Sequence, residues 1–519
     1  MEQGRTTSRD IVTQSLVRIA TYEDRLNAAI TINPRALTEA DERDRERRAG
    51  RIRGPLHGIP IALKDNIHTT AMATTGGALA FARLVPPYEA TLTRNLREAG
   101  AIIIAKTVLT ELANWVSDRM PTNYNSLAGY GFNPYDPRRD PRDNADGRPV
   151  LATGGSSSGI GTAASFWAAS VGTETSGSIL SPSNQTMLAG IKPTVGRISR
   201  YGVIPIAAEQ DTPGPMARSV TDAAIMLGVL ESASPDPNDS ATKRCAAPEG
   251  RDYRKYLKRD GLKGARIGIP RAFYYDAIAA TDARGSSGGL NPAQNTVMEE
   301  AVSVLRAQGA TVVDPADIPS VVTKDPARNL LLWPTCSGPG DAKGRDEDCS
   351  VVFKYGMKRD FNAWLASLGD RAPVRTLAEL RAWNRTHEAA GTLKYGQAQL
   401  DISDEMELQA DRGRYEADRE KDVTLAGRDG IDAALKDNRL DALVFPGSAG
   451  AALAAKPGYP TVIVPFGMVP NNVAVAGFDA KPSPYGVSFT GTACSEGRLI
   501  ELAYAFEQAT RRRVPPPLD

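Results

Sequence analysis

Residues 90–107, ATLTRNLREAGAIIIAKT, carry the clearest signal of fold class in this sequence. The pattern predicts a helix that stops at Gly100, followed directly by an isoleucine-rich strand. Alternation of helix and strand is typical of an α/β protein. We therefore expect a mixed central β-sheet sandwiched between helices.

Other apolar runs extend this pattern. GIPIALKDNI at 58–67 follows a Gly-x-Pro entry and is typical of a buried strand. Further buried strands are predicted at 265–270, 440–446 and 459–467, and a closing helix at 496–512. Residues 281–292 and about 320–435 are irregular or form charged helices, which we interpret as insertions, the longer one supplying cap helices at the mouth of the core. We expect one domain over 1–519, with its core at about 8–280 and 440–512.

Composition excludes several classes of protein. The chain has 519 residues, 41% hydrophobic and 24% charged, which are ordinary values for a globular protein. Its 62 basic and 61 acidic residues leave a net charge of +1, so nothing in the charge recruits nucleic acid or an anionic membrane. No apolar run reaches the roughly 18 residues of a membrane span. The first residues contain no signal peptide, and the compartment is left open because a targeting segment could precede them.

Cysteine and histidine are both scarce. The four cysteines form no CxxC pair, which argues against a zinc or thioredoxin-like site. Cys336 and Cys349 are close enough in sequence for a disulfide, although two ordinary thiols are the favoured interpretation. Three histidines leave little material for a metal site, and we predict no metal and no cofactor.

GGSSSGIG at 154–161 poses the question of function. A phosphate-binding P-loop requires a Lys after its last Gly, and none follows Gly159 or Gly161. A dinucleotide site requires a third glycine, which is also missing. A phosphate- or nucleotide-binding protein is therefore the weaker hypothesis, and thermal shift with ATP or phosphate would detect it.

A serine in such a loop becomes nucleophilic when a neighbouring base takes its proton. Lys64 follows the apolar residues of the 58–67 run, and desolvation there would lower its pKa. A neutral lysine could then accept a proton from one serine through a second serine. The alternative is a surface lysine paired with Asp65, and composition alone favours that alternative.

Several motifs in order resemble the amidase signature family. They are LHGIPIALKDNI, GGSSSG, GTETSGSILSPS, GIKPTVGRISRYGVIP and QDTPGPMARSVTDAA. The resemblance covers about 8–225 and returns at 440–510, which is more than half of the chain.

The resemblance implies a Ser-cisSer-Lys triad. Block by block, the nucleophile matches Ser178, the bridging serine Ser156 and the base Lys64. The backbone N–H groups of Thr175, Ser176, Gly177 and Ser178 match the oxyanion hole of the family.

Two departures from the family pattern affect the details. Ser156 and Ser178 are 22 residues apart, about two fewer than usual, so Ser157 is an alternative bridge. Leu180 stands where many relatives carry an arginine. In having a leucine here, the sequence resembles the peptide-amidase and aryl-acylamidase branch, and this resemblance implies a neutral or apolar substrate.

Other polar and aromatic residues receive supporting roles. Asp211 and Arg218 are expected to brace the nucleophile loop, and Thr173 to orient the site together with Thr175. The stretch that contains Trp115, Met120, Tyr124 and Tyr130 is a candidate lining of the substrate mouth, with core packing as the alternative.

The expected reaction is hydrolysis of a small-molecule amide, such as an anilide or a peptide C-terminal amide, through an acyl-enzyme. Esters or carbamates, as in a urethanase, could meet the same serine. A glutamyl-tRNA amidotransferase component is the alternative within the family. We expect a monomer or homodimer without a nucleic-acid or membrane partner.

Overall fold

The computed structural model describes residues 1–519 apart from 2, 143–145, 155–157, 280–286 and 519. The strands are β1 (Ala29–Ile32), β2 (Pro60–Lys64), β3 (Ile102–Thr107), β4 (Tyr124–Asn125), β5 (Gly129–Tyr130), β6 (Ala169–Glu174), β7 (Ala189–Lys192), β8 (Thr212–Ala217), β9 (Arg266–Gly268), β10 (Thr311–Val313), β11 (Ala442–Pro446), β12 (Thr461–Val469) and β13 (Ser483–Thr490). In the described part of the chain, eleven of them form one sheet, in the order β1-β3-β2-β6-β8-β7-β12-β13-β11-β9-β10, and β4 pairs with β5. The predicted strands at 58–67, 265–270, 440–446 and 459–467 correspond to β2, β9, β11 and β12.

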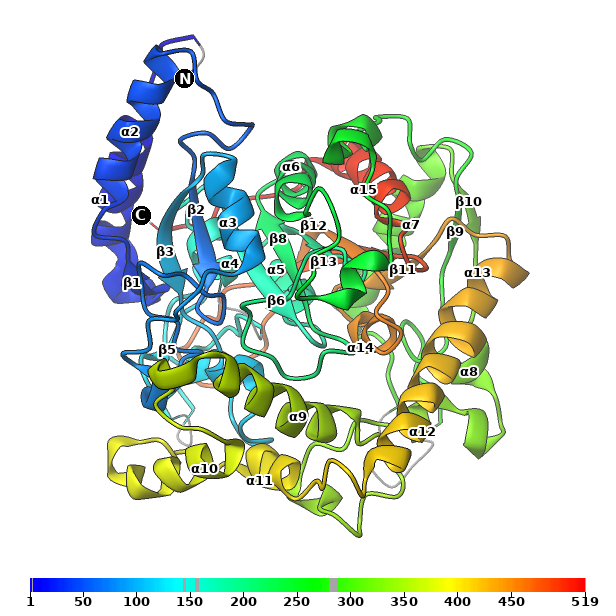
Figure 1. The fold of residues 1–519 in the computed structure, drawn as a ribbon. Helices are drawn as coiled ribbons and strands as arrows, with labels where there is room; N and C mark the ends of the chain where they lie inside the picture. Colours follow the sequence, from blue (N-terminus) through cyan, green and yellow to red (C-terminus); the bar gives the residue numbers. More distant parts are fainter. Residues whose placement is uncertain (2, 143–145, 155–157, 280–286, 519) are drawn as a thin grey trace.

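The helices lie on both faces of this sheet and around its ends (Figure 1). They are α1 (Ser8–Leu26), α2 (Ala36–Arg48), α3 (Thr91–Glu98), α4 (Ser158–Ala163), α5 (Leu180–Gln185), α6 (Val220–Leu230), α7 (Pro292–Ala307), α8 (Pro319–Val322), α9 (Val352–Ser367), α10 (Leu377–Thr386), α11 (Ala398–Asp404), α12 (Arg412–Val423), α13 (Ala433–Asp437), α14 (Ala451–Ala455) and α15 (Glu496–Thr510). The sheet is mixed, because β2 pairs in parallel with β3 and β6, whereas β6 and β8 are antiparallel. The predicted fold class is confirmed.

Side chains along β2 and β3 point alternately to the two faces of the sheet, and both faces are covered by apolar clusters. Ile61, Leu63 and Ile103 pack into one apolar cluster with residues of α3, α6 and α15. Ala62 and Ile104 point the other way, into a second cluster with residues of α1 and α4. Successive side chains of a strand point to opposite faces, so a strand buried on both sides is apolar throughout.

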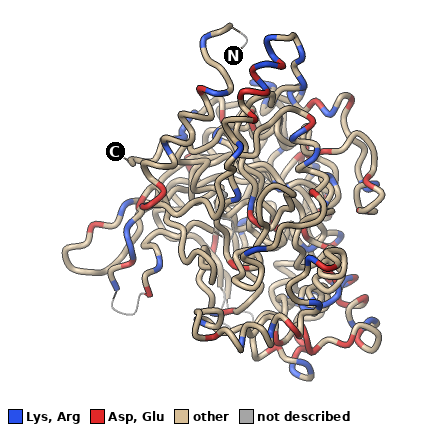
Figure 2. The backbone as a smooth tube through the Cα atoms, turned by 60° about the vertical axis from the view of Figure 1, so that its left-hand side comes forward, with Lys and Arg blue, Asp and Glu red and all other residues tan. Residues whose placement is uncertain are grey.

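The 320–435 segment packs around the sheet. Leu330, Leu425 and Ile431 belong to the same apolar cluster as the strand residues Ile61 and Leu63, whereas α9, α10 and α11 contribute to another cluster. Figure 1 shows α9, α10 and α11 along the lower edge of the view and α12 along the right-hand side. Basic and acidic residues are interspersed along the described backbone, in keeping with the net charge of +1 (Figure 2). No described helix is both long enough and apolar enough to cross a bilayer.

The structure contains two disulfides, one between neighbouring segments and one between distant segments. Cys336 and Cys349 are bonded, with Cα atoms 5.1 Å apart, so the favoured interpretation of two free thiols is wrong and the disulfide that their spacing allowed is present. Cys245 and Cys494 form a second bond across 249 residues. Sequence spacing could not reveal this pair, because folding alone brings the two segments together.

The two disulfides should contribute unequally to stability. In the chain-entropy model a crosslink stabilises by restricting the unfolded chain, and the restriction grows with loop length. Replacing Cys245 and Cys494 with Ala should cost about 5 kcal/mol, against about 3 kcal/mol for Cys336 and Cys349. Urea unfolding of the two double variants would measure this difference, and equal losses would contradict the expected order.

Candidate active site

Lys64 is the last residue of β2, an interior strand between β3 and β6. Its side chain is 0% exposed. Nζ donates hydrogen bonds to the carbonyl oxygen of Thr173 at 3.1 Å and to Oγ1 of Thr173 at 3.0 Å. Asn66 Nδ2 donates to the same Oγ1 at 2.9 Å. Lys64 is thus held against β6 by uncharged acceptors of a single threonine.

The alternative of an exposed Lys64 paired with Asp65 is wrong. Asp65 Oδ1 pairs with Lys106 Nζ at 2.9 Å, and both side chains are 0% exposed. Asp65 Oδ2 accepts from the backbone N–H of Thr75 at 3.1 Å. The strand ends at Lys64, and Asp65 begins a turn in which the Ile67 N–H donates to the Lys64 carbonyl oxygen at 3.0 Å, so Asp65 reaches a different lysine.

Burial lowers the pKa of Lys64 to about 7, because the ammonium loses its water, while the charges of Asp211 and Glu174 act in the opposite direction. A neutral amine has two N–H groups and one lone pair. When both N–H groups donate to Thr173, the lone pair is left to accept a proton. The geometry and the pKa therefore both suit a general base near neutral pH.

Ser178 lies in the turn between β6 and α5 and is 8% exposed. Gly177 has a φ of +87°, a conformation that glycine adopts without steric cost. Among the described residues, a Cβ built on Gly177 would find only the Ala451 methyl within 4 Å, at 3.8 Å. Within that part of the chain the turn is not crowded at Gly177, and Ser176 is exposed.

Glu174 fixes this turn and was missed by the sequence analysis. Its Oε2 accepts hydrogen bonds from the backbone N–H groups of Ile179 at 2.7 Å and Leu180 at 2.9 Å. A carboxylate at these positions satisfies N–H groups at the start of α5. The signal was an acidic residue four positions before Ser178 in a stretch of small residues.

Asp211 holds the other side of the turn. One carboxylate oxygen accepts from Thr175 Oγ1, and the other accepts from the backbone N–H groups of Ile206 at 2.9 Å and Ala207 at 3.0 Å. Burial raises the pKa of Asp211 to about 7. Arg218, also expected beside the nucleophile loop, instead donates to the carbonyl oxygen of Trp167 at 2.9 Å.

Ser156 and its alternative Ser157 lie outside the described residues, so the bridging role stays a prediction. The roles of Lys64 and Ser178 likewise stay predictions. The structure does place the Lys64 amine against Thr173 of β6, the strand that leads into the Ser178 turn. In the ranges that are described, no three His, Cys, Asp or Glu side chains are grouped as metal ligands.

The four aromatic and methionine residues proposed for the substrate mouth pack into one apolar cluster; they are Trp115, Met120, Tyr124 and Tyr130. All are at most 8% exposed. Trp115 packs edge-on against Phe353 of α9, with ring centroids 5.0 Å apart. Their positions agree with the alternative interpretation of this stretch, which is packing in the core. Contact with a substrate stays a prediction.

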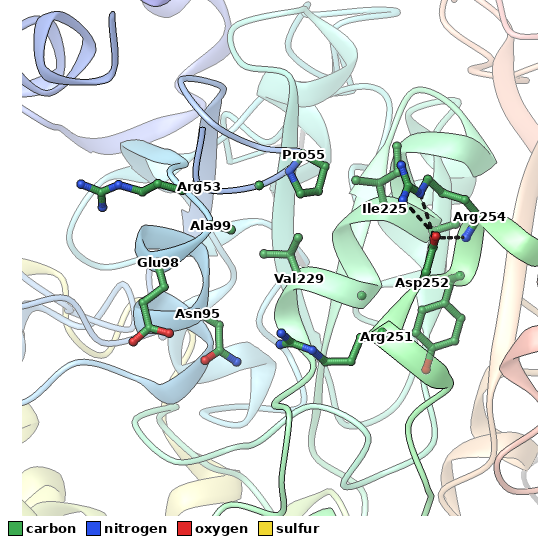
Figure 3. A pocket seen from close by; sticks show the side chains of 15 residues that line it. Arg53, Pro55, Asn95, Glu98, Ala99, Ile225, Val229, Arg251, Asp252 and Arg254 are labelled. Atoms are coloured by element: carbon green, nitrogen blue, oxygen red, sulfur yellow. Dashed lines mark hydrogen bonds and ion pairs between the residues drawn. The ribbon is translucent and has the colours of Figure 1, made fainter. Parts of the chain in front are cut away.

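A surface cavity of about 290 Å³ lies elsewhere, between α3, α6 and residues 250–254 (Figure 3). Its lining includes Arg53, Asn95 and Glu98. Arg254 there is paired with Asp252 at 2.8 Å. None of the predicted site residues lines this cavity.

Comparison with known proteins assigns the family. A family model described as Amidase matches residues 10–500. The chain belongs to the amidase family, as the serine motifs predicted. The crystal structure of native peptide amidase from Stenotrophomonas maltophilia is similar to it, with a TM-score of 0.82 and 37% identity, covering 100% of this chain and 96% of that chain.

Two relatives known from sequence cover nearly the whole chain. A probable amidase of Arabidopsis thaliana is 34% identical over 520 residues, which is 99% of this chain and 89% of the relative. A glutamyl-tRNA(Gln) amidotransferase component from Thermosynechococcus vestitus is 32% identical over 523 residues, covering 96% of this chain and 94% of the relative.

The pKa of Lys64 predicts a pH dependence of activity. Below about 7 the amine is protonated and has no lone pair to offer, so kcat/KM should fall about tenfold per pH unit as the pH drops and level off above 7. Initial rates on a neutral amide between pH 5 and 9 would measure the profile.

Asp211 provides the control, because burial raises its pKa to about 7 as well. Asp211→Asn should lower the rate and keep a single inflection, moved to lower pH because the Asp211 charge, which raises the pKa of Lys64, is lost. A flat profile in the wild type, or loss of the inflection in Asp211→Asn, would contradict the assignment to Lys64.

Proposed function

We propose that this protein hydrolyses a carbon–nitrogen amide bond through an acyl-enzyme on Ser178. Membership in the amidase family and similarity to a peptide amidase support this proposal. The observation that carries it is the fully buried Lys64 amine, whose two N–H groups donate to Thr173 and thereby leave the lone pair for a proton.

In the proposed acylation step, Ser178 Oγ attacks the amide carbonyl carbon. Its proton passes to the hydroxyl of Ser156, which gives its own proton to neutral Lys64. The resulting tetrahedral oxyanion collapses and the carbon–nitrogen bond breaks. The leaving nitrogen takes the proton back along the same route and departs as the amine.

Deacylation uses the same groups in the same order. Water attacks the acyl carbonyl, its proton moves through Ser156 to Lys64, and the ester bond to Ser178 breaks. Ser178 recovers its proton as the acid leaves. Lys64 returns to the neutral state, so no net proton stays on the enzyme.

The backbone of the turn supplies the proposed oxyanion hole. N–H donors of Thr175, Ser176, Gly177 and Ser178 would be aimed at the developing negative charge, and each such donor is typically worth about 3–4 kcal/mol. Among the described residues only the Ala451 methyl comes within 4 Å of a Cβ built on Gly177, which supports close approach of a substrate carbonyl. Glu174 and Asp211 would keep these donors fixed before the reaction begins.

For the substrate we propose neutral amides, such as anilides or peptide C-terminal amides. Leu180 is 1% exposed and packs with Ala451 and Ile463, which gives the start of α5 an apolar side without a guanidinium. Esters and carbamates present the same carbonyl to the serine and belong in the same screen. Because the chain is also similar to an amidotransferase component, glutamine is added to the screen to distinguish that activity from hydrolysis of neutral amides.

Replacing Ser178 with Ala should lower amide hydrolysis by about 10⁴-fold or more, since the proposed acyl-enzyme forms on the hydroxyl that this change removes. The assay is a panel of chromogenic anilides, peptide amides, esters, carbamates and glutamine. Ser181→Ala in α5 serves as the matched control and should retain activity, with both variants checked for a wild-type unfolding transition.

Peptide mapping after labelling with a serine-directed phosphonate should locate the label on Ser178. Normal anilide hydrolysis by a folded Ser178→Ala protein would contradict the proposed mechanism. Activity on glutamine alone would instead favour the amidotransferase alternative.

A further inference from the structure

A five-residue segment, 207–211, lies between the nucleophile turn and helices α9 and α12. We call it the 207–211 bridge. The backbone N–H groups of Gln210 and Asp211 both donate to the Ala207 carbonyl oxygen at 3.0 Å. The Asp211 carboxylate closes the segment by accepting from the Ala207 N–H. These bonds make the bridge a compact, internally hydrogen-bonded unit.

The inner side of the bridge holds Thr175. Asp211 accepts from Thr175 Oγ1, and Gln210 Nε2 donates to the Thr175 carbonyl oxygen at 3.2 Å. Thr175 is three residues before Ser178, so both its side chain and its backbone are positioned from the bridge. The proposed oxyanion donors begin at this residue.

The outer side of the bridge is docked on α9. Asp360 Oδ2 accepts from the Ala208 N–H at 2.8 Å. Gly356, one helical turn earlier, faces Ala207, and a Cβ at position 356 would lie 2.8 Å from the Ala207 Cβ. The helix and the bridge thus touch without room for a methyl group.

Glu209 joins the bridge to both helices. Arg359 Nη2 of α9 donates to its two carboxylate oxygens at 2.7 and 3.0 Å, and Tyr415 of α12 donates to Oε1. Arg359 Nη1 also donates to the Tyr415 hydroxyl at 2.9 Å. Tyr415 stacks on Tyr355 with ring centroids 4.3 Å apart. The Glu209 side chain is 13% exposed and that of Arg359 30%, so water screens this cluster only in part.

We propose that Glu209 is a positioning residue, through which α9 and α12 hold the oxyanion turn in its reactive geometry. The inference rests on the proposed function. The route runs from Arg359 and Tyr415 through Glu209 to Asp211 and Gln210, and from these to Thr175. Because the turn is held in place by this route, loosening its outer end disturbs the transition state more than the binding of substrate.

Glu209→Gln tests the proposal, since it keeps the size of the side chain and removes its charge. We expect kcat to fall about tenfold with KM within about twofold, together with an about tenfold slower labelling of Ser178 by a fluorophosphonate. Tyr415→Phe, which removes a single donor to Glu209, should shift the same quantities in the same direction and to a smaller extent.

Asp404→Asn is the matched control. Asp404 is 12% exposed and pairs with Arg381 and with Lys358 of α9, so it belongs to a similar buried ion cluster that does not touch the bridge. It should leave kcat and the labelling rate unchanged even where it lowers the melting temperature as much as Glu209→Gln does.

A double-variant cycle separates positioning from simple loss of stability. Thr175→Val removes the side-chain bond to Asp211, so Glu209→Gln should have a smaller effect in that background than in the wild type. The inference would be overturned if the losses in kcat of the two single variants simply multiply in the double variant, or if Glu209→Gln leaves kcat and labelling unchanged as Asp404→Asn does. Either result with an active wild-type protein leaves the proposed function standing. Absence of both hydrolysis and Ser178 labelling in the wild type would overturn the proposed function as well.

Discussion

The proposed active site depends on the burial of the Lys64 amine away from water. Lys64 is fully buried and hydrogen-bonded to Thr173, and burial lowers its pKa from 10.5 to about 7. At 1.36 kcal/mol per pKa unit, that shift costs the folded protein roughly 5 kcal/mol relative to an exposed lysine at pH below 7. The sheet on which Lys64 sits must offset this cost. Interior strands with apolar side chains on both faces supply the needed burial.

A second buried lysine shows what distinguishes Lys64. Lys106 in the neighbouring strand β3 is also 0% exposed, but it pairs with Asp65 and donates to Thr74 Oγ1 at 2.7 Å. A charged partner stabilises the ammonium and suits a structural role. Lys64 has neutral acceptors instead, and the carboxylates that influence its pKa, Asp211 and Glu174, hold the turn that contains Ser178. The same residue type, equally buried, is thereby suited to two different tasks.

Local pattern was sufficient for much of the fold. The helix and strand within 90–107 became α3 and β3, with Gly100 between them at a φ of +85°, because glycine there ends the helix without steric cost. The 58–67 run became β2 for the same local reason, its uninterrupted apolar character. The pairing of β6 with β8 and the Cys245–Cys494 bond were not predictable in this way, because both join segments whose meeting depends on the packing of the whole chain.

By itself, the sequence determined the sheet between helices, the serine motifs and the identity of Lys64 as the candidate base. Motifs and periodicity are local, and they survive in any arrangement of the surrounding chain. Tertiary structure alone decided that Lys64 faces Thr173 and not Asp65, that Glu174 and Asp211 hold the turn, and that Glu209 ties this turn to α9 and α12. These are contacts between residues up to about 200 positions apart, and a side chain selects its partner only when the folded backbone fixes which groups lie within reach.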